Sequence, residues 1–140
     1  MMEDIRLPKG CSLIHLPNVV DDRGMLTFVE GNRHIPFEIK RIFWTYNVKE
    51  GEMRGNHAHR TCSMVLFPVG GGYGIELDDG SYRCTLHMKD PHIGLLVPPG
   101  VWCRLSDFTS EAACVCLASH LYDADDYIHD YDEFLKFVGL

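Results

Sequence analysis

Apolar and polar residues alternate in short segments along most of this 140-residue chain. The two-residue period places Ile42, Trp44 and Tyr46 on one face of a strand within 37–48. The Asp-Asp-Gly sequence at 78–80 is a hairpin signal, so the segments on either side of it should pair. Further strands, separated by glycine and proline turns, are predicted at 25–29, 57–69, 82–88, 94–97, 101–105 and 112–118. This series is typical of an all-β sandwich or barrel.

The period changes in the C-terminal tail. From Ile128 to Val138 the apolar residues recur at three- and four-residue steps, and Asp125 or Asp126 can cap a helix there. We expect this short helix to pack on the barrel as a lid or brace. No linker or repeat interrupts the sequence, so residues 1–140 are predicted to form one domain.

Composition narrows the class of protein. The formal net charge is -7, and the longest basic cluster is Lys40-Arg41, which argues against a nucleic-acid partner. No apolar run is long enough for a secretory signal or a membrane span, so we expect a cytoplasmic protein. The six cysteines contain no CxxC pair and are expected to be reduced core residues.

A histidine pair carries the most specific chemical signal. Residues 51–59 have the form G-x5-H-x-H, and residues two apart in a strand project to the same face, so His57 and His59 should point together. Thr61 and Ser63 would extend that face. An imidazole has an ordinary pKa near 6.5, which suits it to take a proton from one atom and return it to another near neutral pH. The pair therefore indicates an isomerase.

The same spacing resembles the first motif of the cupins, the double-stranded β-helix or jelly-roll family, and the Pro-Pro-Gly sequence at 98–100 resembles their second motif. In metal-binding cupins these motifs also supply a carboxylate and a third histidine. Here the corresponding positions hold Ser63 or Met64, and Cys103. Two imidazoles and one thiol fall short of the three or four ligands that a stable site needs, so no metal or other cofactor is predicted.

Four segments resemble the nucleotide-sugar 3,4-ketoisomerases, the WxcM-like members of the cupin superfamily. The likeness runs from about Arg23 to Leu135, and its motifs are specific only in combination. The segments are Arg23-Gly24-Met25-Leu26, Ile39 to Asn47, Arg54-Gly55-Asn56-His57-Ala58-His59 and Asp125 to Leu135.

This resemblance implies an all-β cupin with a short C-terminal helix that moves the carbonyl of dTDP-4-keto-6-deoxyglucose from C4 to C3 before an aminotransferase acts, in making 3-amino sugars of cell-surface polysaccharide. His57 and His59 would transfer the protons, and Arg54 and Tyr46 would stabilise charge on oxygen. A homodimer is implied as well. Candidate substrate-binding residues are Arg23, Arg41, Trp44, Asn47 and Trp102.

Three alternatives stay open at this point. A 3,5-epimerase of the same nucleotide sugars would also begin by removing a proton beside the 4-keto group, but its usual His–Asp arrangement on separate strands is not visible in the sequence. A non-catalytic cupin that binds a sugar is the second alternative, because fold alone does not give activity. A metal-dependent oxygenase is the third.

Overall fold

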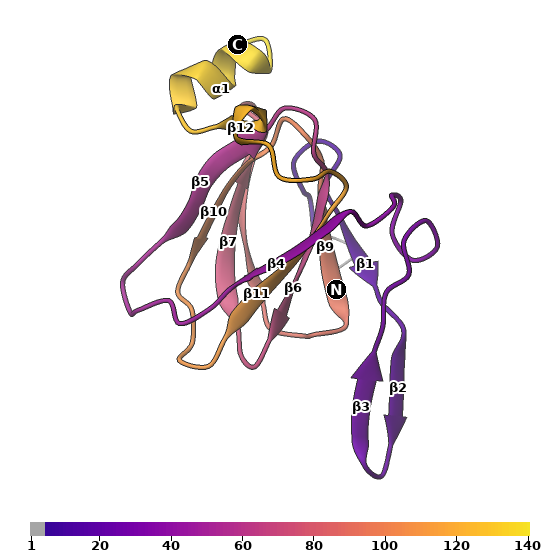
Figure 1. Ribbon diagram of the computed structural model, residues 1–140. Coiled ribbons are helices and arrows are strands. Elements are labelled where there is room, and N and C mark those ends of the chain that lie inside the picture. Colours follow the sequence, from indigo (N-terminus) through magenta and orange to yellow (C-terminus); the bar gives the residue numbers. More distant parts are fainter. Residues whose placement is uncertain (1–4) are drawn as a thin grey trace.

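The computed structural model describes residues 5–140 and confirms the predicted β-barrel with one short C-terminal helix (Figure 1). The first of two five-stranded sheets has, in spatial order, the strands β1 (Ser12–His15), β9 (Ile93–Val97), β6 (Met64–Val69), β11 (Ala113–Ala118) and β4 (Arg41–Thr45). The second sheet has the strands β12 (Tyr127–Ile128), β5 (Arg54–His59), β10 (Trp102–Ser106), β7 (Tyr73–Asp78) and β8 (Arg83–Met88).

The two sheets enclose one large apolar core. Strands β7 and β8 pair in register across the predicted hairpin, with Asp78 opposite Arg83. All six cysteines are free thiols, and four of them are buried. The core side chains come from both sheets and include Met64, Leu66, Tyr73, Ile75, Leu77, Leu95, Cys103, Cys114 and Cys116. The barrel is therefore filled by side chains, as small barrels are.

The tail closes one end of the barrel. A 3-10 turn (Ala124–Asp126) leads into β12, and α1 (Tyr131–Phe137) follows, with Asp130 as its N-cap. The predicted cap at Asp125 or Asp126 was wrong, because Ile128 pairs with β5 as a strand residue before the helix begins. Within residues 5–140, no helix has the length and apolar character needed to cross a membrane.

The predicted continuous strand 57–69 is also corrected. The structure divides it into β5 and β6, because the chain turns at 60–63 and the backbone N–H groups of Thr61 and Cys62 donate to the carboxylate of Asp126. These two N–H groups therefore do not take part in the hydrogen bonds between strands. Thr61 and Ser63 therefore do not extend the face of His57 and His59.

Strand β4 is shorter than predicted and ends at Thr45. Asn47 lies just beyond it with a φ of 55°, a left-handed conformation that a strand cannot continue. The alternation along β4 is as predicted, but it sends Arg41, Phe43 and Thr45 toward the barrel and leaves Ile42, Trp44 and Tyr46 exposed.

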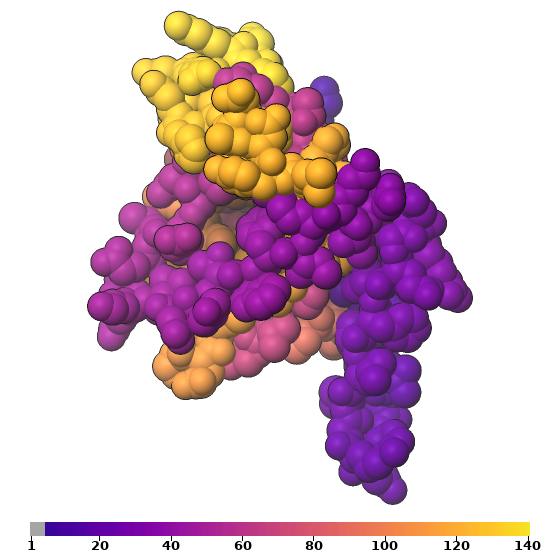
Figure 2. Space-filling model, viewed as in Figure 1, coloured from indigo at the N-terminus to yellow at the C-terminus, as the bar shows by residue number. Residues whose placement is uncertain are grey.

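A two-stranded hairpin projects from the body of the molecule. It consists of β2 (Asn18–Asp21) and β3 (Gly24–Thr27), and Figure 2 shows it as an arm that extends away from the barrel. Its apolar side chains are largely exposed, Met25 to 75 %. An exposed apolar surface of this kind is typical of an interaction site.

Candidate active site

A β-bulge brings Arg54 and His57 to the same side of β5. Simple alternation would place residues three apart on opposite faces. In the structure Leu105 pairs with Arg54 and Cys103 pairs with His57, so Asn56 is the extra residue on β5. Asn56 itself has a φ of 58°. Such bulges commonly re-aim side chains next to functional sites.

His57 lies on the wall of a cavity of about 290 Å³ in the open end of the barrel. The floor of this cavity is apolar and consists of core side chains from both sheets, among them Met64, Leu66, Cys103 and Cys116. Arg54 and Tyr127 line the cavity as well. A small organic molecule could enter there and meet an imidazole, a guanidinium and a phenol.

His59 lies behind His57 and is only 4 % exposed. The two rings meet edge to face, with their centroids 5.2 Å apart. His59 does not line the cavity, and its Nδ1 lies 3.1 Å from a carboxylate oxygen of Asp126. The sequence did not reveal this His–Asp contact, in which His59 lies on β5 and Asp126 in the 3-10 turn, not on a second strand.

Burial decides the charge state of both histidines. It lowers the pKa of His57 to about 4, and the neighbouring His59 acts in the same direction. Burial also lowers the pKa of His59 below its ordinary value, although the bond to Asp126 opposes this effect. Both rings are therefore neutral near pH 7, the state in which an imidazole can accept a proton.

Two aromatic residues near the histidines were not predicted from the sequence. The ring of Tyr127 lies 5.0 Å from that of His57 and 4.4 Å from that of His59. His129 stacks on Tyr127 at 5.7 Å and is also 5.9 Å from His57. The Asp-Tyr-Ile sequence of the tail carried this signal, because pairing of β12 with β5 places Tyr127 opposite His59.

Arg41 belongs to this cluster. Its guanidinium donates a 3.4 Å hydrogen bond to the hydroxyl of Tyr127 and lies 4.0 Å from the thiol of Cys62. Simple alternation had suggested that Arg41 lies on the face away from Tyr46, and this is correct. The inward face is the one on which Arg41 contacts Tyr127, which lies beside both histidines.

Three other predicted residues gather in a second, more open hollow of about 480 Å³. Trp44, Tyr46 and Asn47 line it together with Lys49, and Trp44 and Arg54 belong to both hollows. The smaller cavity at His57 and the more open hollow are therefore adjacent. The first suits a sugar ring in size, and the second offers aromatic and cationic side chains.

Two predicted substrate-binding residues lie elsewhere. Arg23 is at the tip of the projecting hairpin, where it forms an exposed ion pair with Asp21 at 2.8 Å. Trp102 is buried beneath α1 against Tyr131 and Phe134. Neither residue lines the cavity at His57.

Within the described residues, one group has the composition of a metal site. Possible ligand atoms of His59, Cys62 and Asp126 lie within 4.8 Å of one another. The carboxylate of Asp126 already accepts hydrogen bonds from His59, Thr61 and Cys62, and the Arg41 guanidinium is next to the thiol. A cation there would meet a positive charge and occupied oxygens, so the donor set does not fit a metal ion.

Comparison with known proteins agrees with this geometry. Residues 9–139 match the family described as "FdtA: WxcM-like, C-terminal". The chain is 39 % identical over 127 residues to a TDP-4-oxo-6-deoxy-alpha-D-glucose-3,4-oxoisomerase from Aneurinibacillus thermoaerophilus, with 91 % of each protein covered.

Solved structures give the same result. A histidine-to-asparagine mutant of the 3,4-ketoisomerase QdtA from Thermoanaerobacterium thermosaccharolyticum, in complex with TDP-4-keto-6-deoxyglucose, is 33 % identical with a TM-score of 0.91 over 93 % of this chain and 94 % of that one. The WlaRB TDP-quinovose 3,4-ketoisomerase from Campylobacter jejuni is 37 % identical with a TM-score of 0.87 over 91 % and 98 % of the two chains. The chain therefore belongs to the WxcM-like family of TDP-sugar 3,4-ketoisomerases.

Proposed function

We propose that this protein converts TDP-4-keto-6-deoxyglucose into its 3-keto isomer. The observation that carries the proposal is the placement of His57 on the wall of a cavity of about 290 Å³. The relative that is 39 % identical is named as a 3,4-oxoisomerase of this 4-oxo-6-deoxy sugar, and the match covers 91 % of this chain.

The reaction needs a base at carbon. The hydrogen on C3 is acidified by the C4 carbonyl, so a neutral imidazole can remove it while the electron pair forms a C3=C4 double bond and O4 becomes an enolate oxygen. Protonation of O4 and of C4, together with loss of the proton from O3, then gives a carbonyl at C3 and a hydroxyl at C4, with as many protons returned as removed. We assign the carbon proton transfer to His57, because it lines the cavity and His59 does not.

The charge that develops on oxygen needs donors. Arg54 lines the cavity beside His57 and suits this role, because a guanidinium is a permanent charged donor. Tyr127 also lines the cavity, and its hydroxyl is held by Arg41. Tyr46 lies in the adjacent hollow, so we assign exchange of the oxygen protons to Tyr127 in its place.

The nucleotide part of the substrate fits the open hollow. Trp44 and Tyr46 offer aromatic surface to the base, and Lys49 and Arg54 offer positive charge to the diphosphate. Asn47 adds an amide. Because Arg23 lies on the hairpin and Trp102 beneath α1, we leave both out of this subsite.

Proton NMR of TDP-4-keto-6-deoxyglucose incubated with the purified protein in deuterated buffer tests the proposal. A 3-keto sugar with deuterium at C4 is the expected product. Exchange at C5 without a carbonyl shift would identify a 3,5-epimerase. An unchanged spectrum, with the substrate bound or not, would overturn the proposed activity.

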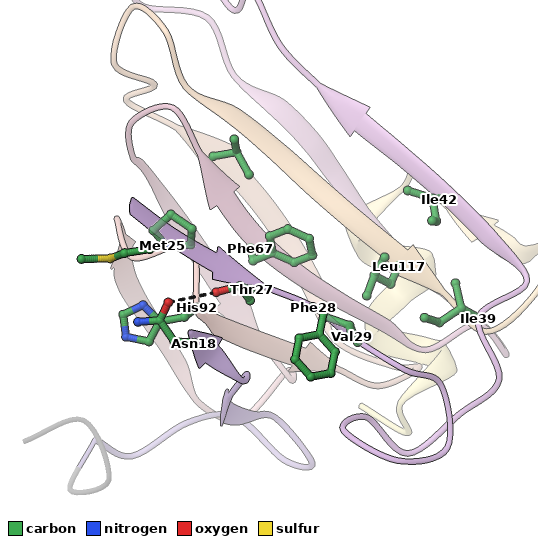
Figure 3. Close-up of a pocket in the computed structure, with 12 residues that line it drawn as sticks. Asn18, Met25, Thr27, Phe28, Val29, Ile39, Ile42, Phe67, His92 and Leu117 are labelled. Atoms are coloured by element: carbon green, nitrogen blue, oxygen red, sulfur yellow. Dashed lines mark hydrogen bonds between the residues drawn. The ribbon is translucent and has the colours of Figure 1, made fainter. Parts of the chain in front are cut away.

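We also propose a homodimer. The groove of about 450 Å³ between the projecting hairpin and the first sheet is lined almost wholly by apolar side chains, including Met25, Ile42 and Phe67 (Figure 3). Of these lining residues, Met25 and Ile42 are 75 % and 54 % exposed. A second copy of the chain supplies a matching apolar arm and face, whereas a monomer would leave both in water.

The wider role follows from the product. A 3-keto group is the substrate of an aminotransferase, so we place the reaction before the formation of a 3-amino deoxysugar for cell-surface polysaccharide such as the lipopolysaccharide O-antigen. We propose that it occurs in the cytoplasm. Six free thiols in a chain of this length suit a reducing compartment.

A further inference from the structure

Asp126 is held in one orientation from both of its oxygens. Oδ1 accepts hydrogen bonds from the backbone N–H and the hydroxyl of Thr61, at 2.8 and 2.6 Å. Oδ2 accepts from the N–H of Cys62 at 3.2 Å and lies 3.1 Å from Nδ1 of His59. Burial alone would raise the pKa of Asp126, but these hydrogen bonds outweigh it and hold the pKa below its ordinary value. The carboxylate is therefore ionised and accepts only.

The backbone fixes the same arrangement. Tyr127 pairs with His59 across β12 and β5, and the N–H of Arg60 donates to the carbonyl of Asp126 at 2.9 Å. The carboxylate and the imidazole are thus joined by a short stretch of sheet as well as by their own contact. This pairing fixes the backbone positions from which both side chains extend.

The other ring nitrogen of His59 has no partner. Nε2 is buried and makes no hydrogen bond within the described residues, and the rings nearest to the imidazole are those of His57 and Tyr127. An acceptor-only carboxylate at Nδ1 requires a proton on Nδ1, because two lone pairs would otherwise face each other. Nε2 must then carry a lone pair.

We propose that Asp126 is a positioning residue that fixes the proton of His59 on Nδ1, so that Nε2 offers a bare lone pair to the catalytic cluster around His57. His59 can then accept a proton within the cluster, from His57 or through a water molecule, without contacting the sugar. The catalytic part of this proposal rests on the proposed isomerase function. The assignment of the tautomer does not.

The substitution Asp126→Asn has a specific expected effect. The two donors from Thr61 are closer than the single N–H of Cys62 and select the amide oxygen for the Oδ1 position, which leaves the amide NH₂ facing Nδ1 of His59 and costs the bond from Cys62. An NH₂ group donates, so the proton of His59 should move to Nε2. Inverting the tautomer of a His–Asp pair in this way is known to cost an enzyme several orders of magnitude in rate, so we expect kcat to fall at least about 100-fold with KM within about threefold.

Long-range ¹H–¹⁵N NMR of the histidine rings tests the proposal, with the His59 signals assigned by their loss in His59→Asn. The wild-type protein should show His59 protonated on Nδ1, and Asp126→Asn should show it protonated on Nε2 and lose turnover of TDP-4-keto-6-deoxyglucose. Asp125→Asn changes a neighbouring exposed carboxylate whose side chain holds no such bond, and it should change neither property.

A wild-type His59 protonated on Nε2 would overturn the proposal, and this measurement needs no variant to fold. Full turnover by Asp126→Asn with the inverted tautomer would overturn the catalytic part. If the wild-type protein gave no turnover at all while His59 carried its proton on Nδ1, the isomerase function would fail and the tautomer assignment would stand.

Discussion

The two faces of strand β4 differ in what they contact, although they belong to the same five residues. The inward face carries Arg41, whose guanidinium reaches Tyr127 and the buried end of the site. The outward face carries Ile42, which is 54 % exposed and borders an apolar groove, and Trp44, which is 57 % exposed and lines the open hollow. Alternation along one strand thus separates Arg41, at the buried end of the site, from Ile42, at the groove, while Trp44 borders the substrate hollow. Arg41 and Ile42 can therefore be changed independently.

The largest effect is expected on the inward side. His57→Asn removes the group assigned to proton transfer at carbon, and loss of a general base typically costs 10²- to 10⁴-fold, so we expect kcat to fall by about 1,000-fold. Turnover measured by NMR checks this. His87→Asn, at an exposed position of β8, is the control and should retain full activity. Equal activity of both variants would remove His57 from the mechanism.

On the outward side, Ile42→Asp should separate the subunits. An unpaired carboxylate buried at an apolar interface costs on the order of 3 kcal/mol or more, which weakens the dimer at least about 100-fold. Sedimentation equilibrium measures the change. Leu121→Asp places the same charge on an exposed loop residue outside the groove and should leave the dimer intact. A wild-type protein that sediments as a monomer would contradict the prediction.

Two tyrosines sharpen the contrast between the cavity and the open hollow. Tyr127→Phe removes a hydroxyl at the cavity wall, and we expect kcat to fall by about 10- to 100-fold, as for other lost proton carriers. Tyr46→Phe alters the nucleotide subsite and should change KM more than kcat. Steady-state kinetics on both variants decides between the two residues. The reverse pattern would assign oxygen proton exchange to Tyr46.

The smallest effect is the response to pH. Burial holds the pKa of His57 at about 4, so kcat/KM should stay level as the pH falls from 8 to about 5, with no loss near the ordinary histidine pKa of about 6.5. The unfolded chain takes up that proton near pH 6.5 and the folded chain does not. The free energy of unfolding should therefore decrease as the pH falls from about 6.5 toward 4.

His57→Asn removes this linkage. We expect the free energy of unfolding, measured with urea at several pH values, to change less steeply with pH in the variant than in the wild type. The difference should be up to about 1.4 kcal/mol per pH unit, which corresponds to one proton. A kcat/KM profile that instead falls with a midpoint near pH 6.5 would mean that His57 of the free protein titrates near its ordinary pKa, which would contradict the prediction.

Patterns within short segments of the sequence correctly predicted the features that depend on neighbouring residues alone. The hairpin at 78–80 and the alternation of Ile42, Trp44 and Tyr46 followed from period and turn chemistry, and both are present. The histidine pair was likewise identified from its spacing within one strand. Which face of β4 lies inside the barrel was not predictable, because it depends on the sheet that packs against it.

Long-range contacts account for what was missed. Asp126 is 67 residues from His59, and no spacing rule joins them. The same carboxylate takes the backbone N–H groups of Thr61 and Cys62, which ended the strand that the sequence pattern had continued to residue 69. One distant residue therefore explains both the broken strand and the unpredicted His–Asp pair.

Because of the bulge at Asn56, the spacing of residues in this segment decides which side chains face the inside of the barrel. Its extra residue changes the phase of the strand between Arg54 and His57, so a guanidinium and an imidazole three positions apart share one wall. Deleting Asn56 would keep every group assigned to the reaction in the sequence, yet it would turn Arg54 to the outside of the barrel. In a homologue that lacks this residue, a matching arginine and histidine would therefore not be sufficient evidence for the same activity.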